Sequence, residues 1–176
     1  MSKEEIIKQL HAAKEEFTGF CTGIDNDSFF RQPIEKWSVA QNIRHLIISA
    51  NTTKLAFSLP KFLVRLYAGK PNRLSRNYDE LVNKYKTKLQ QGGKARGRYI
   101  PAIISAKAGK ENMLHSFTRS MNKLINSIDK NWTDPQLDLY IAPHPLLGKI
   151  ILRELCYFTI YHTGHHLNSI KERLPD

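Results

Sequence analysis

Hydrophobic residues recur along most of this chain at spacings of three and four, which is the period of an amphipathic helix. Between residues 3 and 20 the apolar positions are Ile6, Leu10, Ala13 and Phe17. This stripe predicts a first helix over residues 3–20. No segment shows the sustained alternation of apolar and polar residues that a half-buried strand requires. The pattern therefore indicates an all-α protein.

The second predicted helix covers residues 39–58 and follows a turn-rich stretch over residues 22–36. Ser38 is placed to cap its first turn, with Gln41 at the third helical position as the partner of a capping box. Pro60 should break this helix because proline lacks the backbone N–H that a helix interior needs. A short helical continuation is expected over residues 62–67.

Three further helices are predicted in the second half of the chain. One covers residues 78–90, begins after Ser75 or Asn77 and stops before the glycine pair at 92–93. The others cover 111–128 and 147–174, joined by a proline-containing connection. Four long helices with one extra short helix in the middle indicate a helical bundle, which builds its sites from side chains on facing helices. We expect one domain over residues 1–176.

Composition places few constraints beyond a globular protein. The chain has 176 residues, of which 41% are hydrophobic, enough for a single core. Its first residues carry no apolar leader segment, and no later stretch approaches the roughly 18 apolar residues of a membrane span. We therefore expect a cytoplasmic protein without a membrane partner. Cys21 and Cys156 lack any metal or redox spacing and are interpreted as small buried hydrophobic residues.

The net charge of +11 is concentrated in one segment. Residues 61–110 contain 13 basic residues against Asp79 and Glu80, so this segment accounts for the whole excess. Such a segment could attract an anionic partner, or it could simply be a solvated surface. No zinc-finger spacing or RNA-binding aromatic motif accompanies it, so we do not expect nucleic acid. The glycine-rich run at 92–97 lacks the GK[ST] of a phosphate-binding loop.

Three histidines are the main candidates for chemistry. His162 and His166 are four residues apart on the last predicted helix, so they share one face. His45 lies on the second predicted helix and could complete a set of three nitrogen ligands, the number that catalytic zinc sites use. His165 points about 100° away from His166 and is interpreted as a lateral residue. The alternative is that the histidines are satisfied by hydrogen bonds without a metal.

The surroundings of His45 leave two interpretations open. It shares a polar lane with Ser38, Gln41, Asn42, Ser49 and Thr52, which either faces solvent or lines a wet cavity inside the bundle. No carboxylate is clearly placed as a general base. Glu35, Glu154 and Asp138 are expected at the surface, and Trp37 is expected to plug the end of the bundle.

Two ordered segments resemble one protein family. EKWSVAQNIRHLI, residues 35–47, and YHTGHHLNSIKERL, residues 161–174, are similar to the two histidine motifs of the DinB-like superfamily in its DinB-2 branch. The resemblance implies an up-down-down-up four-helix bundle. It also implies one divalent metal ion, zinc or nickel, held by His45, His162 and His166. The middle of the chain, residues 59–110, carries no motif of this family.

The family resemblance implies a small-molecule substrate and admits two reactions, hydrolysis and transfer of a low-molecular-weight thiol. For the second, Lys94, Arg96 or Arg98 could bind the carboxylates that such thiols carry. Homodimers are compatible with the resemblance. Two other functions stay open at this point: a metal-stabilised binding module without turnover, and a binder of an anionic partner through the basic segment 61–110.

Overall fold

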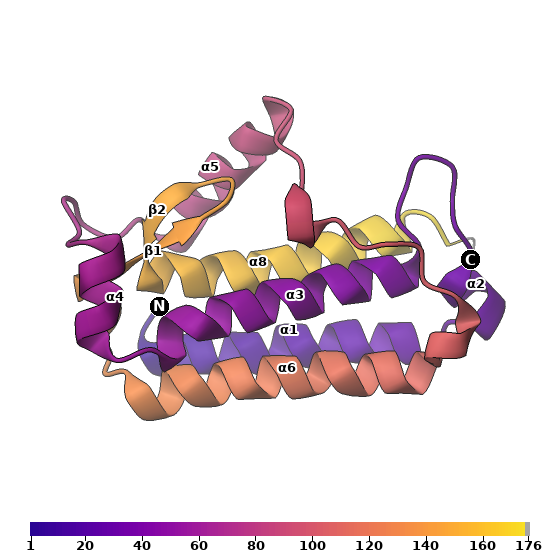
Figure 1. The fold of residues 1–176 in the computed structure, drawn as a ribbon, viewed down its shortest axis with the longest axis horizontal. Coiled ribbons are helices and arrows are strands. Elements are labelled where there is room, and N and C mark those ends of the chain that lie inside the picture. The colour runs from indigo at the N-terminus through magenta and orange to yellow at the C-terminus, as the bar shows by residue number, and fades with distance from the viewer. Residues whose placement is uncertain (175–176) are drawn as a thin grey trace.

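Four long helices form the body of the protein in a computed structural model that describes residues 1–174. They are α1 (Lys3–Thr22), α3 (Val39–Ser58), α6 (Lys110–Asn131) and α8 (Leu152–Lys171). Figure 1 shows α1 and α8 running in one direction along the bundle and α3 and α6 in the other. The predicted up-down-down-up bundle is therefore confirmed.

Local signals in the sequence account for where these helices begin. The Ser38 hydroxyl accepts a hydrogen bond from the Gln41 N–H, and the Gln41 side chain accepts one from the Ser38 N–H. This is the predicted capping box, which satisfies two backbone donors that the helix leaves free. Asn77 caps α5 (Tyr78–Gln90) in the same way with Glu80. Pro60 separates α3 from the short helix α4 (Lys61–Ala68), as expected.

The core lies between the apolar faces of the four long helices. Phe17 of α1 contacts Phe117 of α6, with ring centroids 4.9 Å apart. The apolar stripe of α6 is buried, and it comprises Met113, Phe117, Met121, Leu124, Ile125 and Ile128. The helices therefore follow the hydrophobic pattern of the sequence, because each stripe can leave water only by packing against the others. Among residues 1–174, no helix has the length and hydrophobicity needed to cross a membrane.

The main departure from the predicted helices is a β-hairpin before α8. Strands β1 (Ile141–His144) and β2 (Gly148–Ile151) pair antiparallel, with Ile141 opposite Ile151 and His144 opposite Gly148. The last helix therefore begins at Leu152 and not at residue 147. Prolines at 143 and 145 exclude a helix here, and Gly148 turns the chain with a φ of +75°. Both strands are only four residues long, and β1 contains Pro143, so neither shows an alternating pattern that would reveal it in the sequence.

Further short elements occupy stretches that were expected to be loops. They are α2 (Asn26–Phe30), α7 (Gln136–Leu139) and two 3₁₀ turns, Gly97–Tyr99 and Ala106–Ala108. The turn Gly97–Tyr99 matters for the site because it brings the segment that leaves α5 against α3. Figure 1 shows this segment crossing α3 near the middle of the bundle.

A buried ion pair holds the segment before α5 against α8. The Glu154 carboxylate is fully buried and accepts hydrogen bonds from the Arg73 guanidinium at 2.5 and 2.6 Å and from the Arg76 N–H at 2.7 Å. It also caps the first turn of α8 through the Ile151 N–H. The expectation that Glu154 is a surface carboxylate is thus wrong. Burial opposes ionisation, but these donors hold the pKa of Glu154 below its ordinary value.

Candidate metal centre and its cavity

The three predicted histidines meet inside the bundle although their two helices are far apart in sequence. His45 projects from α3, and His162 and His166 project from consecutive turns of α8. The Nε2 atom of His162 lies 3.1 Å from that of His45 and 3.0 Å from that of His166. All three side chains are buried. Together they form a cluster that could hold a metal ion.

Hydrogen bonds on the outer side of the ring orient two of these histidines. His45 Nδ1 lies 2.7 Å from the backbone oxygen of Tyr99, and His166 Nδ1 lies 2.7 Å from Asn42 Oδ1. Both oxygens can only accept, so each Nδ1 carries the proton. The amide of Asn42 is itself fixed, because its Nδ2 donates to the Ser38 oxygen at 2.8 Å. In a neutral imidazole the other nitrogen then has a free lone pair, and here those lone pairs face the centre.

The electrostatic surroundings favour neutral rings. Burial is the main cause that lowers the pKa of His45, and it lowers those of His162 and His166 well below 6.5. The neighbouring histidines lower the latter two further, because one protonated ring repels another. All three rings are therefore neutral at pH 7, which is the form that binds metal ions.

The spacing of the nitrogens also fits a single ion. Two nitrogens held by one zinc at about 2.0–2.1 Å are roughly 3.0–3.4 Å apart when the bonds subtend about 95–110°. The observed separations of 3.0 and 3.1 Å fall in that range. Without an ion, His162 Nε2 can carry only one proton and cannot satisfy both neighbouring lone pairs. The donor set therefore fits a divalent cation better than it fits a hydrogen-bonded network.

Trp37 covers the histidine cluster at the start of α3. Its ring lies parallel to that of His166, with an angle of 4° and centroids 6.1 Å apart, and its centroid is 5.0 Å from that of His45. The residue was expected to plug the bundle end. It packs directly on two candidate ligands and limits how water reaches them from that side.

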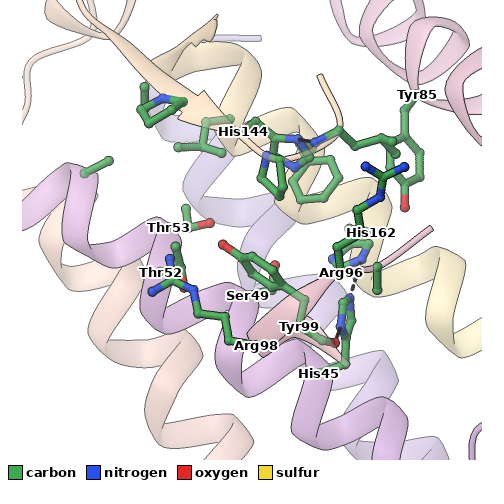
Figure 2. A pocket seen from close by; sticks show the side chains of 18 of the residues that line it. His45, Ser49, Thr52, Thr53, Tyr85, Arg96, Arg98, Tyr99, His144 and His162 are labelled. Atoms are coloured by element: carbon green, nitrogen blue, oxygen red, sulfur yellow. Dashed lines mark hydrogen bonds between the residues drawn. The ribbon is translucent and has the colours of Figure 1, made fainter. Parts of the chain in front are cut away.

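The cluster opens into a cavity of about 970 Å³. One face of α3 lines it from His45 through Ser49, Thr52 and Ala56 to Leu59, and α8 contributes Phe158 and the histidines. Figure 2 shows His45 and His162 at this cavity together with Ser49 and Thr52. The polar lane of the second predicted helix therefore lines a cavity from His45 onward. Its first residues, Ser38, Gln41 and Asn42, are buried and serve as cap and ligand support.

The charges around this cavity are all positive. Lys88 of α5 lines it together with Lys94, Arg96 and Arg98, whose segment follows α5. None of the aspartates or glutamates within residues 1–174 lines it. Figure 2 shows Arg96 and Arg98 beside the same cavity as the histidines. Part of the basic segment 61–110 thus faces the candidate metal centre, while Arg73 and Arg76 serve the ion pair with Glu154.

Three more residues at the cavity have chemistry that could matter. Burial raises the pKa of Tyr85 to about 12, so its hydroxyl stays protonated and is a hydrogen-bond donor. His144 of the hairpin accepts at Nδ1 from the N–H groups of Leu146 and Leu147, at 3.2 and 3.1 Å. Its neutral ring therefore carries a proton on Nε2. His165 lines the cavity but is outside the cluster of three, in agreement with its predicted lateral position.

Sequence reasoning missed the roles of Tyr85, Tyr99 and His144. Tyr85 lies on the buried, apolar side of α5, where a tyrosine looks like any other core residue in the sequence. Tyr99 acts through its backbone oxygen, which every residue has. His144 lies on the hairpin that the pattern did not predict. Of the residues that orient the histidines, only Asn42 is recognisable in the sequence, as a polar residue next to the apolar stripe of α3.

The cysteines are separate from this site. Both side chains are buried, and burial raises the pKa of Cys21 and of Cys156 to about 12. Neither thiol ionises at neutral pH, so neither is a nucleophile. This agrees with their interpretation as small hydrophobic residues.

The sequence model of the DinB superfamily matches residues 9–170, a range that includes all three histidines of the cluster. No curated protein matches the chain.

Proposed function

The chain belongs to the DinB superfamily, and from that premise we propose that it is a metal-dependent enzyme that transfers a low-molecular-weight thiol to an electrophilic small molecule. The observation that carries the proposal is the convergence of three neutral histidine nitrogens at the end of a cationic cavity. His45, His162 and His166 would hold one zinc or nickel ion. The cavity leaves room on one side of the ion for a substrate.

A divalent ion bound there supplies Lewis acidity, which lowers the pKa of a coordinated thiol or water. The choice between these two follows from the residues around the site. A water nucleophile is usually assisted by a carboxylate base, and no aspartate or glutamate of residues 1–174 lines the cavity. A thiol needs no such base, because its proton is far more acidic than that of water. This favours thiol transfer over hydrolysis.

The protein side chains would position the two reactants. Lys94 offers a charged donor to a carboxylate of a low-molecular-weight thiol, which leaves Arg96 and Arg98 for the other reactant. In the transfer the thiol gives its proton to water, its sulfur forms a bond to the electrophilic carbon, and the bond from that carbon to the leaving group breaks. The leaving group departs into solvent as an anion with the electron pair of that bond. The protonated Tyr85 hydroxyl can donate a hydrogen bond to the leaving group.

Hydrolysis is the second candidate, and one observation supports it. Ser49, Thr52 and Thr53 line the cavity on the α3 side and make part of its wall polar, so water can enter. A metal-stabilised binding module would keep the same ligands without turnover. A binder of large anionic partners is less favoured, because four of the basic side chains face the cavity and two more pair with Glu154.

Elemental analysis of protein purified without chelator tests the proposal. We expect about one zinc or nickel per chain in wild type and a loss of most of it in His45→Ala, His162→Ala and His166→Ala. The control is His115→Ala, which changes an exposed histidine on α6. Circular dichroism of each variant establishes that it is folded. Full metal content in all three variants, or none in wild type after incubation with both metals, would contradict the proposed site.

Activity is tested with the metal-loaded protein, a panel of low-molecular-weight thiols and an activated aryl chloride. We expect thiol-dependent release of chloride, and a higher KM for the thiol in the variant Lys94→Gln. Chloride release that does not depend on the thiol would favour hydrolysis. A metal-loaded protein without either activity would favour the binding module.

A further inference from the structure

The cavity is long and its two ends differ in character. Its lining runs along α3 from His45 to Leu59, which directly follows the helix; these two residues are fourteen positions apart, or about 21 Å at the rise of a helix. The end near His45 holds the histidine cluster with Arg96 beside it, whereas the Arg98 side chain extends along α3 toward Thr52 (Figure 2). The lining turns apolar toward Leu59, through Ala56 and Leu55. A ligand that fills the whole cavity would therefore need a charged part and an apolar part at opposite ends.

Helix α4 and strand β1 complete the apolar end. The lining there comprises Val64, Tyr67 and Ala68 of α4 with Ile141 and Ala142 of β1. None of these side chains carries a charge. Figure 1 shows α4 and β1 together at the end of the bundle where α3 finishes. A volume of about 970 Å³ is at the upper limit for cavities that hold drug-sized ligands. A small hydrophilic thiol would fill only its cationic end.

The apolar lining reaches the surface of the protein at α4. Tyr67 lines the cavity and is 79% exposed, so it lies where the apolar end meets solvent. Phe62 and Leu66 of the same helix are 70% and 80% exposed but do not line the cavity. No acidic residue occurs between Glu35 and Asp79, a stretch that includes all of α3 and α4.

We infer that the cavity binds a single-chain anionic amphiphile, with its carboxylate or phosphate head at Arg96 beside the histidines and its alkyl chain along α3 toward α4. This names the substrate class of the site proposed above and so rests on that proposal. The lining residues include positive charges and no carboxylate, so we infer an anionic head group. The far end of the cavity is long and apolar, so we infer an alkyl chain there.

Calorimetric titration of the protein with dissolved dodecanoate tests this, in metal-free and zinc-loaded samples and below the concentration at which the ligand forms micelles. Hexanoate has the same head and a chain shorter by six methylenes, and dodecyltrimethylammonium has the same chain with a cationic head. We expect hexanoate to bind about a hundredfold more weakly or worse, because each buried methylene contributes severalfold to affinity. The cationic amphiphile should bind at least about tenfold more weakly than dodecanoate.

Variants at each end separate the head from the chain. The double variant Arg96→Gln/Arg98→Gln should weaken dodecanoate by about tenfold or more and leave dodecyltrimethylammonium no weaker. Its control, Lys107→Gln/Arg119→Gln, makes the same change in net charge at exposed residues outside the cavity. Leu59→Glu should weaken dodecanoate and leave hexanoate unchanged. Tyr67→Glu makes the same test at a highly exposed position where folding is not at risk.

Several results would overturn the inference. These are the absence of dodecanoate binding in both samples, equal affinity for the two head groups, and no effect of the double arginine variant. A dimer that Leu66→Glu dissociates, together with no dodecanoate binding, would show that α4 is covered by a second copy. The metal proposal is tested separately. A protein that never retains metal, but binds dodecanoate with the expected dependence on head-group charge and chain length, would support the amphiphile site and contradict the proposed enzyme.

Discussion

The hydrogen bond from His166 to Asn42 gives the most specific prediction about the metal centre. Asn42→Ala removes the oxygen that lies 2.7 Å from His166 Nδ1 and leaves both residues' backbones in place. Both side chains are buried, so water cannot easily replace the lost acceptor. The His166 ring is then free to move its proton from Nδ1 to Nε2, which is the nitrogen that would bind the metal.

The expected effects follow from this geometry. Loss of such an outer partner of a ligand histidine weakens metal binding by about 10- to 100-fold, which corresponds to about 1.4–2.7 kcal/mol. A buried N–H without an acceptor should also lower the free energy of unfolding of the metal-free protein by about 1–3 kcal/mol. The two effects are measured separately, by competition with a zinc-binding dye and by urea unfolding.

Thr52→Ala is the matched control for Asn42→Ala. Thr52 also lines the α3 side of the cavity, but its hydroxyl donates to the Ile48 oxygen of its own helix at 2.9 Å and contacts no histidine. The zinc affinity of the Thr52→Ala variant should equal that of wild type. If Asn42→Ala binds zinc as tightly as Thr52→Ala does, the hydrogen bond does not set the state of His166 and the reasoning is refuted.

Three other predictions concern pH, the buried ion pair and the cysteines. Burial lowers the pKa of His144 from 6.5 to about 4, so as pH falls the unfolded chain is protonated at this residue before the folded protein is. The free energy of unfolding should therefore decrease by up to about 3 kcal/mol between pH 6.5 and pH 4. Urea unfolding should show a smaller decrease in His144→Gln. Glu154→Gln removes the buried carboxylate that pairs with Arg73 and should lower the free energy of unfolding by about 2–3 kcal/mol without changing the metal content. The cost is moderate because the Arg73 side chain is 30% exposed and water partly solvates it. Cys21 and Cys156 should not react with a thiol reagent in the native protein and should both react in urea; fast labelling of either without denaturant would contradict their burial.

Much of the fold was predictable because helices are governed by local interactions. The apolar stripe of α1, the capping box at Ser38 and the break at Pro60 involve residues within four positions of one another, so the sequence specifies them directly. The elements that were missed lack such local signals. Residues 141–151 form a hairpin only because two four-residue strands pair with each other and pack over α8.

The candidate metal centre divides in the same way. The sequence by itself determined that His162 and His166 share a face, because i and i+4 positions always do on a helix. Only the tertiary structure decided that His45 meets them, that Tyr99 and Asn42 orient the rings, and that Arg96 and Arg98 border the same cavity. These contacts join segments separated by 54 to 124 positions along the chain. Such contacts depend on how the four helices pack to bury their apolar faces, which no local pattern encodes.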